Sequence, residues 1–229
     1  MSEGSALEAI NDRRRGSETP TVLPLHTEQG GMAGGSIRKL RAGDAAPPFE
    51  LPGTDGETYT LESFADDEAL LVVFTCNHCP YAKAKFDALN RIASDYDDVS
   101  VVGINPNDPE KYEADSLERM QELVAAGTID YDAYLFDESQ GVAKAYGAVC
   151  TPDPFLFARE NGEFVLAYHG RLDDALNPDD EPSGEPGFEV REAIESVLAG
   201  EDVEVPFEPS RGCTIKWKPG NEPDYWDDL

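Results

Sequence analysis

Residues 70–80 read LLVVFTCNHCP, and this stretch decides the fold expected for the chain. Residues 70–75 form a nearly continuous apolar run, which is typical of a strand buried on both faces of a sheet. The next five residues hold two cysteines separated by two positions, and apolar residues at helical spacing follow as far as Tyr96. The sequence therefore predicts a buried strand, a Cys-x-x-Cys motif at its carboxyl end, and a helix that opens at Cys76.

Strand and helix patterns alternate on both sides of this stretch. Upstream, two short apolar segments flank Asp55-Gly56, a dipeptide typical of hairpin turns. Downstream, the patterns predict a strand at 99–104, a helix from Asp115 to Gly127, a strand at 133–136, a helix at 139–146, a hairpin at 155–168 around Asn161-Gly162 and a last helix ending at Gly200. We expect an α/β fold with a mixed central sheet, helices on both faces and an N-terminal hairpin extension.

The 229 residues divide into three expected parts. Residues 1–36 hold six glycines and little apolar periodicity, which predicts a flexible N-terminal extension, and both Met1 and Met32 are candidate starts. Residues 37–200 form the α/β domain. Residues 201–229 contain four prolines and predict an irregular tail that packs on the core.

The composition is strongly acidic, with 47 Asp and Glu against 18 Lys and Arg and a formal net charge of −29. This charge disfavours nucleic acids and anionic membrane surfaces as partners, because both need clustered basic residues. No apolar stretch reaches the roughly 18–20 residues that span a bilayer. The acids are scattered, and their mutual repulsion is screened in molar salt, where the Debye length is about 3 Å. We interpret the composition as that of a halophile's protein. The alternative is an acidic protein of a mesophile.

The four cysteines are Cys76, Cys79, Cys150 and Cys213. They are too sparse for a small disulfide-stapled secreted domain, and the N-terminus has no secretory apolar segment. We therefore expect a cytoplasmic protein with a chemically active cysteine pair.

The Cys-x-x-Cys motif predicts thiol–disulfide chemistry. At a helix start, unpaired N–H groups favour the Cys76 thiolate, which is the attacking species in disulfide exchange, and Cys79 can reach back to resolve the mixed disulfide. His78 lies between the cysteines in sequence, and its protonated form would favour the thiolate further. A metal site formed with Cys150, two inert core cysteines, and a surface His78 without a tuning role are the alternatives.

Four motifs occur in order: CNHCPYAKA at 76–84, GAVCTPD at 147–153, GRLDD at 170–174 and GCTIKWKPGNEP at 212–223. With them, the chain over residues 38–226 resembles the thioredoxin superfamily. More narrowly, it is similar to the peroxiredoxin-like branch (alkyl hydroperoxide reductase/thiol-specific antioxidant, AhpC/TSA, or redoxin). This resemblance implies a thioredoxin-like fold.

The resemblance also implies roles for particular residues. Cys76 matches the nucleophile and Cys79 the resolving cysteine. Pro152 matches a cis-proline that faces this pair, and Thr151 would offer backbone groups to a substrate chain. Cys150 would lie nearby, either as a third thiol that resolves oxidised Cys76 or as a small buried residue.

The chain also departs from its relatives' patterns. When the peroxidatic pattern Pro-x-x-x-Thr-x-x-Cys is aligned on Cys76, its proline falls on Ala69 and its threonine on Val73, so the pattern is absent. In addition, Leu70 occupies the position where thioredoxins often carry a buried carboxylate. For the motif around Cys213 we expect only packing of the tail.

We expect a thiol–disulfide oxidoreductase with no organic cofactor and no metal. Its substrates would be protein or small-molecule disulfides, and a thiol or disulfide reductase would recycle it. A thiol peroxidase, with peroxides as substrates and Cys76 as peroxidatic cysteine, and a metal-binding module using the same thiols are the alternatives.

Overall fold

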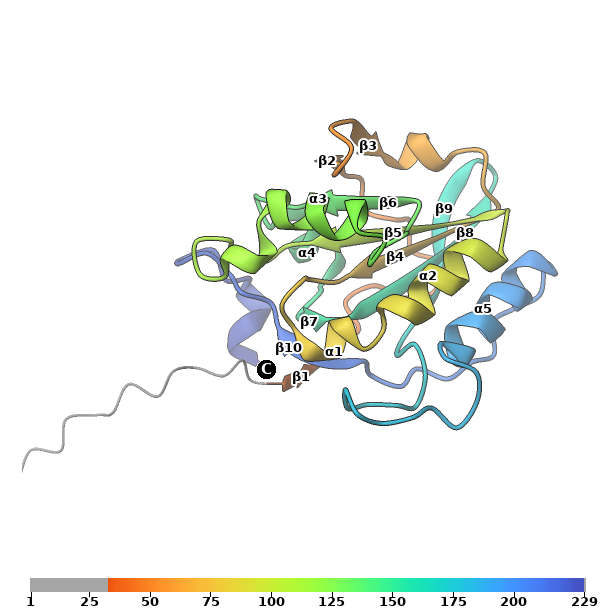
Figure 1. Cartoon of the computed structure of the whole chain (residues 1–229). Helices are drawn as coiled ribbons and strands as arrows, with labels where there is room; N and C mark the ends of the chain where they lie inside the picture. The colour runs from red at the N-terminus through yellow and green to blue at the C-terminus, as the bar shows by residue number, and fades with distance from the viewer. Residues whose placement is uncertain (1–32, 229) are drawn as a thin grey trace, which may run out of the picture. The chain divides into compact units, whose positions relative to one another are not determined.

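A computed structural model describes residues 33–228, and a mixed five-stranded sheet forms its centre (Figure 1). The strand order is β6-β5-β4-β8-β9, and the strands are β4 (Ala69–Phe74), β5 (Val99–Asn105), β6 (Ala133–Phe136), β8 (Asp153–Glu160) and β9 (Glu163–His169). Strands β4, β5 and β6 are parallel, whereas β8 runs antiparallel to both β4 and β9. The mixed sheet expected from the sequence is confirmed.

Strand β4 is buried on both faces, as its apolar sequence predicts. Because successive side chains of a strand point to opposite faces, its residues divide between two core clusters. One face packs against α2 (Phe86–Asp95) and α5 (Phe188–Leu198), which lie on the same side of the sheet in Figure 1. The other face packs against α4 (Gly141–Tyr146). Helices therefore cover both faces, with β4 between them.

Both predicted hairpins are present. Strands β2 (Glu50–Pro52) and β3 (Thr58–Thr60) pair antiparallel and lead into the short 3₁₀ helix η1 (Leu61–Phe64). Between β8 and β9, Asn161 and Gly162 both have positive φ, 51° and 90°, as a two-residue hairpin turn of the primed type requires.

The helix after β4 begins later than expected. The expectation that it opens at Cys76 is wrong: α1 (Pro80–Lys83) begins at Pro80, and Cys79 is its N-cap. A residue that precedes proline is disfavoured in the helical region, and Cys79 is accordingly extended at φ −67° and ψ 124°. Pro80 itself is well suited to the first helical position. Residues 84–85 then separate α1 from α2.

The next helix, α3 (Leu117–Ala125), also begins after its predicted start. Ser116 is its N-cap and accepts a hydrogen bond from the Arg119 backbone N–H, at 3.4 Å. Asp115, the expected start, ends a 3₁₀ turn, η2 (Glu113–Asp115), and its side chain is buried. This leaves the carboxylate of Asp115 free for contacts outside the helix.

A second sheet joins three segments that are distant in sequence. Its order is β1 (Ala33–Gly35), β10 (Arg211–Thr214) and β7 (Cys150–Thr151), all antiparallel. Strand β1 falls inside the extension expected at 1–36, and β10 inside the tail expected to be irregular. After β10, Ile215 and Trp217 are buried in the core on the α4 side, and η3 (Asp224–Asp228) ends the described part.

Residues 1–32 lie outside the described residues, and with them the rest of the expected extension and both candidate starts. Within residues 33–228, no helix has the length and apolar character needed to cross a lipid bilayer.

Candidate active site

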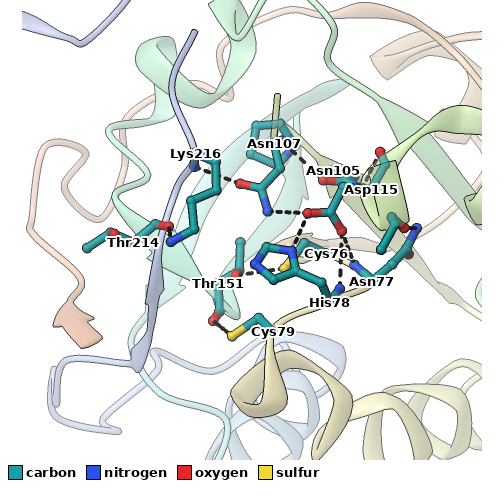
Figure 2. A network of polar contacts seen from close by, with 12 residues as sticks. Cys76, Asn77, His78, Cys79, Asn105, Asn107, Asp115, Thr151, Thr214 and Lys216 are labelled. Atoms are coloured by element: carbon teal, nitrogen blue, oxygen red, sulfur yellow. Dashed lines mark hydrogen bonds and ion pairs between the residues drawn. The ribbon is translucent and has the colours of Figure 1, made fainter. Parts of the chain in front are cut away.

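The two cysteines of the motif meet at one threonine. The Cys76 Sγ lies 3.2 Å from the Thr151 Oγ1, and the Cys79 thiol donates to the Thr151 carbonyl oxygen at 3.4 Å (Figure 2). Cys76 follows β4, Cys79 precedes α1, and Thr151 ends β7, so three elements position the pair. Both cysteines are 0% exposed.

The Thr151–Pro152 peptide bond is cis, as the resemblance implied. The expected place of a substrate chain beside Thr151 is occupied by the protein's own strand β10. Cys213 is the register partner of Thr151, and Thr214 that of Cys150. A Cβ on Gly212 would lie 1.9 Å from the Thr151 carbonyl oxygen, so this close approach requires glycine.

The pairing of β7 with β10 also determines which further thiol is near the motif. Directly opposed residues of two strands share a face, and consecutive residues alternate. Cys213 therefore shares the Thr151 face and packs in one cluster with Cys76 and Cys79. The Cys150 thiol lies toward the carbonyl oxygens of Pro152 and Ser210, at 3.9 and 4.0 Å. The sequence placed Cys150 near the active site and predicted only tail packing around Cys213; in the structure it is Cys213 that packs in the cluster of Cys76 and Cys79.

A buried carboxylate fixes the loop between the cysteines. One oxygen of Asp115 accepts the backbone N–H groups of Asn77 and His78, at 2.7 and 3.2 Å. The other accepts the Asn107 side-chain amide at 2.8 Å and bonds to the His78 ring (Figure 2). Asp115 is 0% exposed. The sequence placed this residue at a helix start; the neighbouring Ser116, an equally good N-cap, was the signal that Asp115 was available for another role.

His78 does not bridge the two sulfurs. Its Nδ1 bonds to Asp115, and its ring stacks on Tyr112 with centroids 4.2 Å apart. Lys216, just after β10, lies with its ammonium 5.7 Å from the centroid of the same Tyr112 ring. The Asn107 side chain also accepts the Lys216 backbone N–H at 2.8 Å. The segment after β10 is thus bonded to the network that holds the cysteine loop.

Of the four cysteines, only Cys79 has a lowered pKa. Hydrogen bonds from the Cys213 and Cys76 thiols hold the pKa of Cys79 well below its ordinary value, against the opposing effect of burial. Burial, donation to Cys79 and the charge of Asp115 raise the pKa of Cys76. Donation to Cys79, followed by burial, raises the pKa of Cys213, and burial raises that of Cys150.

Cys76, His78 and Asp115 are the group best placed to hold a metal ion. One ligand atom from each lies within 4.8 Å of the others, and the three are a soft thiolate, an imidazole and a carboxylate. Both Asp115 oxygens, however, already accept hydrogen bonds from the loop and from Asn107. A metal would have to displace these bonds, so the donor set fits a hydrogen-bonded loop anchor better than a metal site.

Residues 42–174 match the model of the AhpC/TSA family. The chain is similar in structure to an uncharacterized conserved protein from Geobacillus kaustophilus, at 42% identity and a TM-score of 0.76, covering 83% of this chain and 99% of that one. A hypothetical protein from Sinorhizobium meliloti is also 42% identical, with a TM-score of 0.73, covering 81% and 99%. No curated protein matches the chain.

A putative protein disulfide isomerase from Bacteroides thetaiotaomicron is similar at 19% identity, with a TM-score of 0.52, covering 70% of this chain and 92% of that one. At this identity the likeness concerns the fold alone. Together these similarities confirm the thioredoxin-like fold expected from the sequence.

Proposed function

The chain belongs to the AhpC/TSA family, and from this premise we propose that it is a thiol–disulfide oxidoreductase whose redox pair is Cys76 and Cys79. The observation that carries the proposal is the contact of both sulfurs with Thr151, at 3.2 Å and 3.4 Å. Both sulfurs are thus held against one residue within one buried cluster, the proximity that a disulfide bond of about 2 Å requires.

We propose that Cys79 attacks first, and not Cys76 as expected from the sequence. The Cys79 thiolate attacks one sulfur of a substrate disulfide, and the other sulfur leaves as a thiolate that takes up a proton. Cys76 loses its proton and attacks the Cys79 sulfur, which releases the second substrate thiol and leaves a Cys76–Cys79 disulfide. An external thiol reductant restores the dithiol. Cys79 acts first because its pKa is lowered, whereas that of Cys76 is raised.

Asp115 and Thr151 are positioning residues in this scheme. Asp115 fixes the loop that joins the two cysteines through the backbone N–H groups of Asn77 and His78. The Thr151 hydroxyl lies against the Cys76 sulfur, and its hydrogen bond opposes the rise in the pKa of Cys76. The cis Thr151–Pro152 bond lies directly beside the pair.

A thiol peroxidase is the second candidate, and the lowered pKa of Cys79 favours it. The Cys79 thiolate would attack a peroxide, forming a sulfenic acid and releasing an alcohol or water. Cys76 would then condense with the sulfenic acid, forming the same disulfide and releasing water. The peroxidatic cysteine would thus be Cys79, not Cys76 as expected from the sequence.

The experiment compares wild type, Cys76→Ser and Cys79→Ser in two assays, reduction of a small disulfide-bonded protein and reduction of hydrogen peroxide, each with excess dithiothreitol. We expect disulfide reduction in wild type and none above background in Cys79→Ser. Full activity of Cys79→Ser in both assays would refute the mechanism. Peroxide reduction that depends on Cys79, without disulfide reduction in wild type, would establish the peroxidase instead.

A further inference from the structure

Three thiols, not two, meet at this site. Cys76, Cys79 and Cys213 pack in one cluster; the Cys79 sulfur lies 3.4 Å from the Thr151 carbonyl oxygen, and Cys213 is the register partner of Thr151. Cys213 is brought there by β10, which pairs with β7 and packs against α1 (Figure 1). Cys79 therefore has two cysteines, Cys76 and Cys213, in its immediate cluster.

We propose that β10 occupies the position of a substrate strand and that Cys213 is a built-in exchange partner of Cys79, so that the disulfide passes from Cys76–Cys79 to Cys79–Cys213. This inference rests on the proposed function and extends it by a third redox residue. Thr151 is the residue expected to receive a substrate chain, and it pairs with Cys213 while its carbonyl oxygen accepts from the Cys79 thiol at 3.4 Å. A cysteine delivered opposite Thr151 thus faces Cys79.

The exchange is balanced within the chain. Cys213 gives up its proton, and its sulfur attacks the Cys79 sulfur of the Cys76–Cys79 disulfide. The S79–S213 bond forms as the S76–S79 bond breaks, and the electron pair of the broken bond stays on the Cys76 sulfur, which takes up a proton. One disulfide and one thiol exist before and after the step, so no external oxidant or reductant is needed.

The exposed fractions of the cysteines indicate what the transfer of the disulfide to Cys213 would achieve. Cys76 and Cys79 are 0% exposed, whereas Cys213 is 9% exposed, the most accessible of the four cysteines. Lys216, two positions after Thr214, lowers the pKa of Cys213 by its charge, against the larger effects of Cys79 and burial. Transfer to Cys213 therefore gives the disulfide one partner in the most exposed of the four cysteines, where a reductant can attack it more readily. Cys213 is the residue through which the oxidised protein is recycled.

The test maps disulfides by mass spectrometry after trypsin digestion, which leaves the cysteines of interest in three different peptides. Cleavage after Arg and Lys leaves Cys76 and Cys79 in the peptide 42–83, Cys150 in 145–159 and Cys213 in 212–216. Cys76→Ser is treated with one equivalent of diamide, a thiol oxidant, and free thiols are alkylated before digestion. We expect the 42–83 peptide linked to 212–216, which in this variant reports a Cys79–Cys213 disulfide.

Two matched variants control the mapping. Cys76→Ser/Cys150→Ser must keep the link, and Cys76→Ser/Cys213→Ser must lose it. A link from 42–83 to 145–159, or only links between two chains, would overturn the inference. Wild type oxidised in the same way requires no substitution, and the 42–83 to 212–216 link is expected there as a minor species beside the Cys76–Cys79 disulfide.

A kinetic measurement completes the test. The oxidised protein is reduced by dithiothreitol, and we expect Cys213→Ala to react about tenfold more slowly than wild type, because the most exposed of the four cysteines is lost. Equal rates, with both proteins folded by circular dichroism, would contradict the inference while leaving the Cys76–Cys79 mechanism intact. Conversely, the Cys79–Cys213 link in a protein that reduces no disulfide would support the exchange with Cys213 and refute the proposed function.

Discussion

The carboxylate of Asp115 holds His78 at two points, its backbone N–H and its ring Nδ1. The same carboxylate accepts the Asn77 N–H at 2.7 Å, so two consecutive peptide groups between the motif's cysteines are fixed by one buried charge. The Cys76 sulfur lies within 4.8 Å of this group. Asp115 therefore acts on the redox pair both mechanically, through the loop, and electrostatically, by opposing ionisation of Cys76.

The Asp115→Asn substitution separates these effects. Its amide keeps one acceptor oxygen and loses the other, so we expect the unfolding free energy to fall by about 1–3 kcal/mol, the cost of unsatisfied buried donors. Removing a negative charge beside Cys76 favours its thiolate, so the pKa of Cys76 should fall. Urea unfolding and the pH dependence of iodoacetamide alkylation, in a background where Cys76 is the only cysteine, measure the two effects.

Asp137→Asn is the matched control for that substitution. Asp137 is another buried carboxylate, and it accepts the Ala143 backbone N–H at 2.9 Å and the Ser139 hydroxyl at 3.0 Å near the start of α4. Its loss should destabilise the protein without moving the Cys76 titration. An identical shift of that titration in both variants would show that Asp115 acts only through stability.

The sequence predicted the sheet because the signals for the sheet are local. Strand β4 is a buried apolar run, and the turn at Asn161-Gly162 is determined by two residues that tolerate positive φ. The motif's position at the end of β4 follows from these signals. The start of α1 was predictable too: the restriction that Pro80 places on Cys79 is a local effect that outweighs the preference for a helix opening at Cys76.

Two parts of the site could not be predicted because they depend on non-local contacts. Strand β10 reads RGCT, which has no apolar alternation, and it exists because β1 and β7 pair with it on either side. The carboxylate of Asp115 is buried because Ser116 caps α3 in its place and because the amides of Asn77 and Asn107 lie where it points. Neither arrangement leaves a periodic signal in the sequence.

The Gly212→Ala substitution tests the close approach of β10 to β7. A Cβ at this position would lie 1.9 Å from the Thr151 carbonyl oxygen, so β10 must move away, at an expected cost of about 1–3 kcal/mol or more. Alkylation of Cys213 in the native protein should then become faster. Gly35→Ala on β1 is the control, since its nearest contact outside the chain neighbours is an ordinary 3.6 Å. Comparable effects of the two substitutions would contradict this account.

Alkaline pH should destabilise the protein through Cys150. Burial raises the pKa of Cys150, so above about pH 8.5 the unfolded chain loses this proton and the folded chain keeps it. The contribution of Cys150 is thus fully present below its unfolded pKa and is lost as pH rises, by about 1.4 kcal/mol per pH unit. Urea unfolding of wild type and Cys150→Val between about pH 7 and 10 should show the shallower decline in the variant. Cys79 contributes with the opposite sign but is common to both proteins, so parallel slopes would refute the assignment to Cys150.

Salt should stabilise the folded chain because of its net charge of −29. Like charges held close together in the compact state repel one another, and counterions screen this repulsion. The Debye length falls from about 30 Å at 0.01 M to below about 8 Å at 0.3 M, so the unfolding free energy should rise mainly over that interval. Stabilisation that appears only above about 1 M would reflect salt exclusion from the surface instead of screening.

Urea unfolding in a KCl series measures both regimes, and we expect disulfide reduction to be preserved or improved in molar salt. Loss of folding or of activity above about 1 M KCl would refute the halophilic interpretation, yet it would leave the assignment of the Cys76–Cys79 pair standing, because that assignment rests on buried contacts and not on the surface charge.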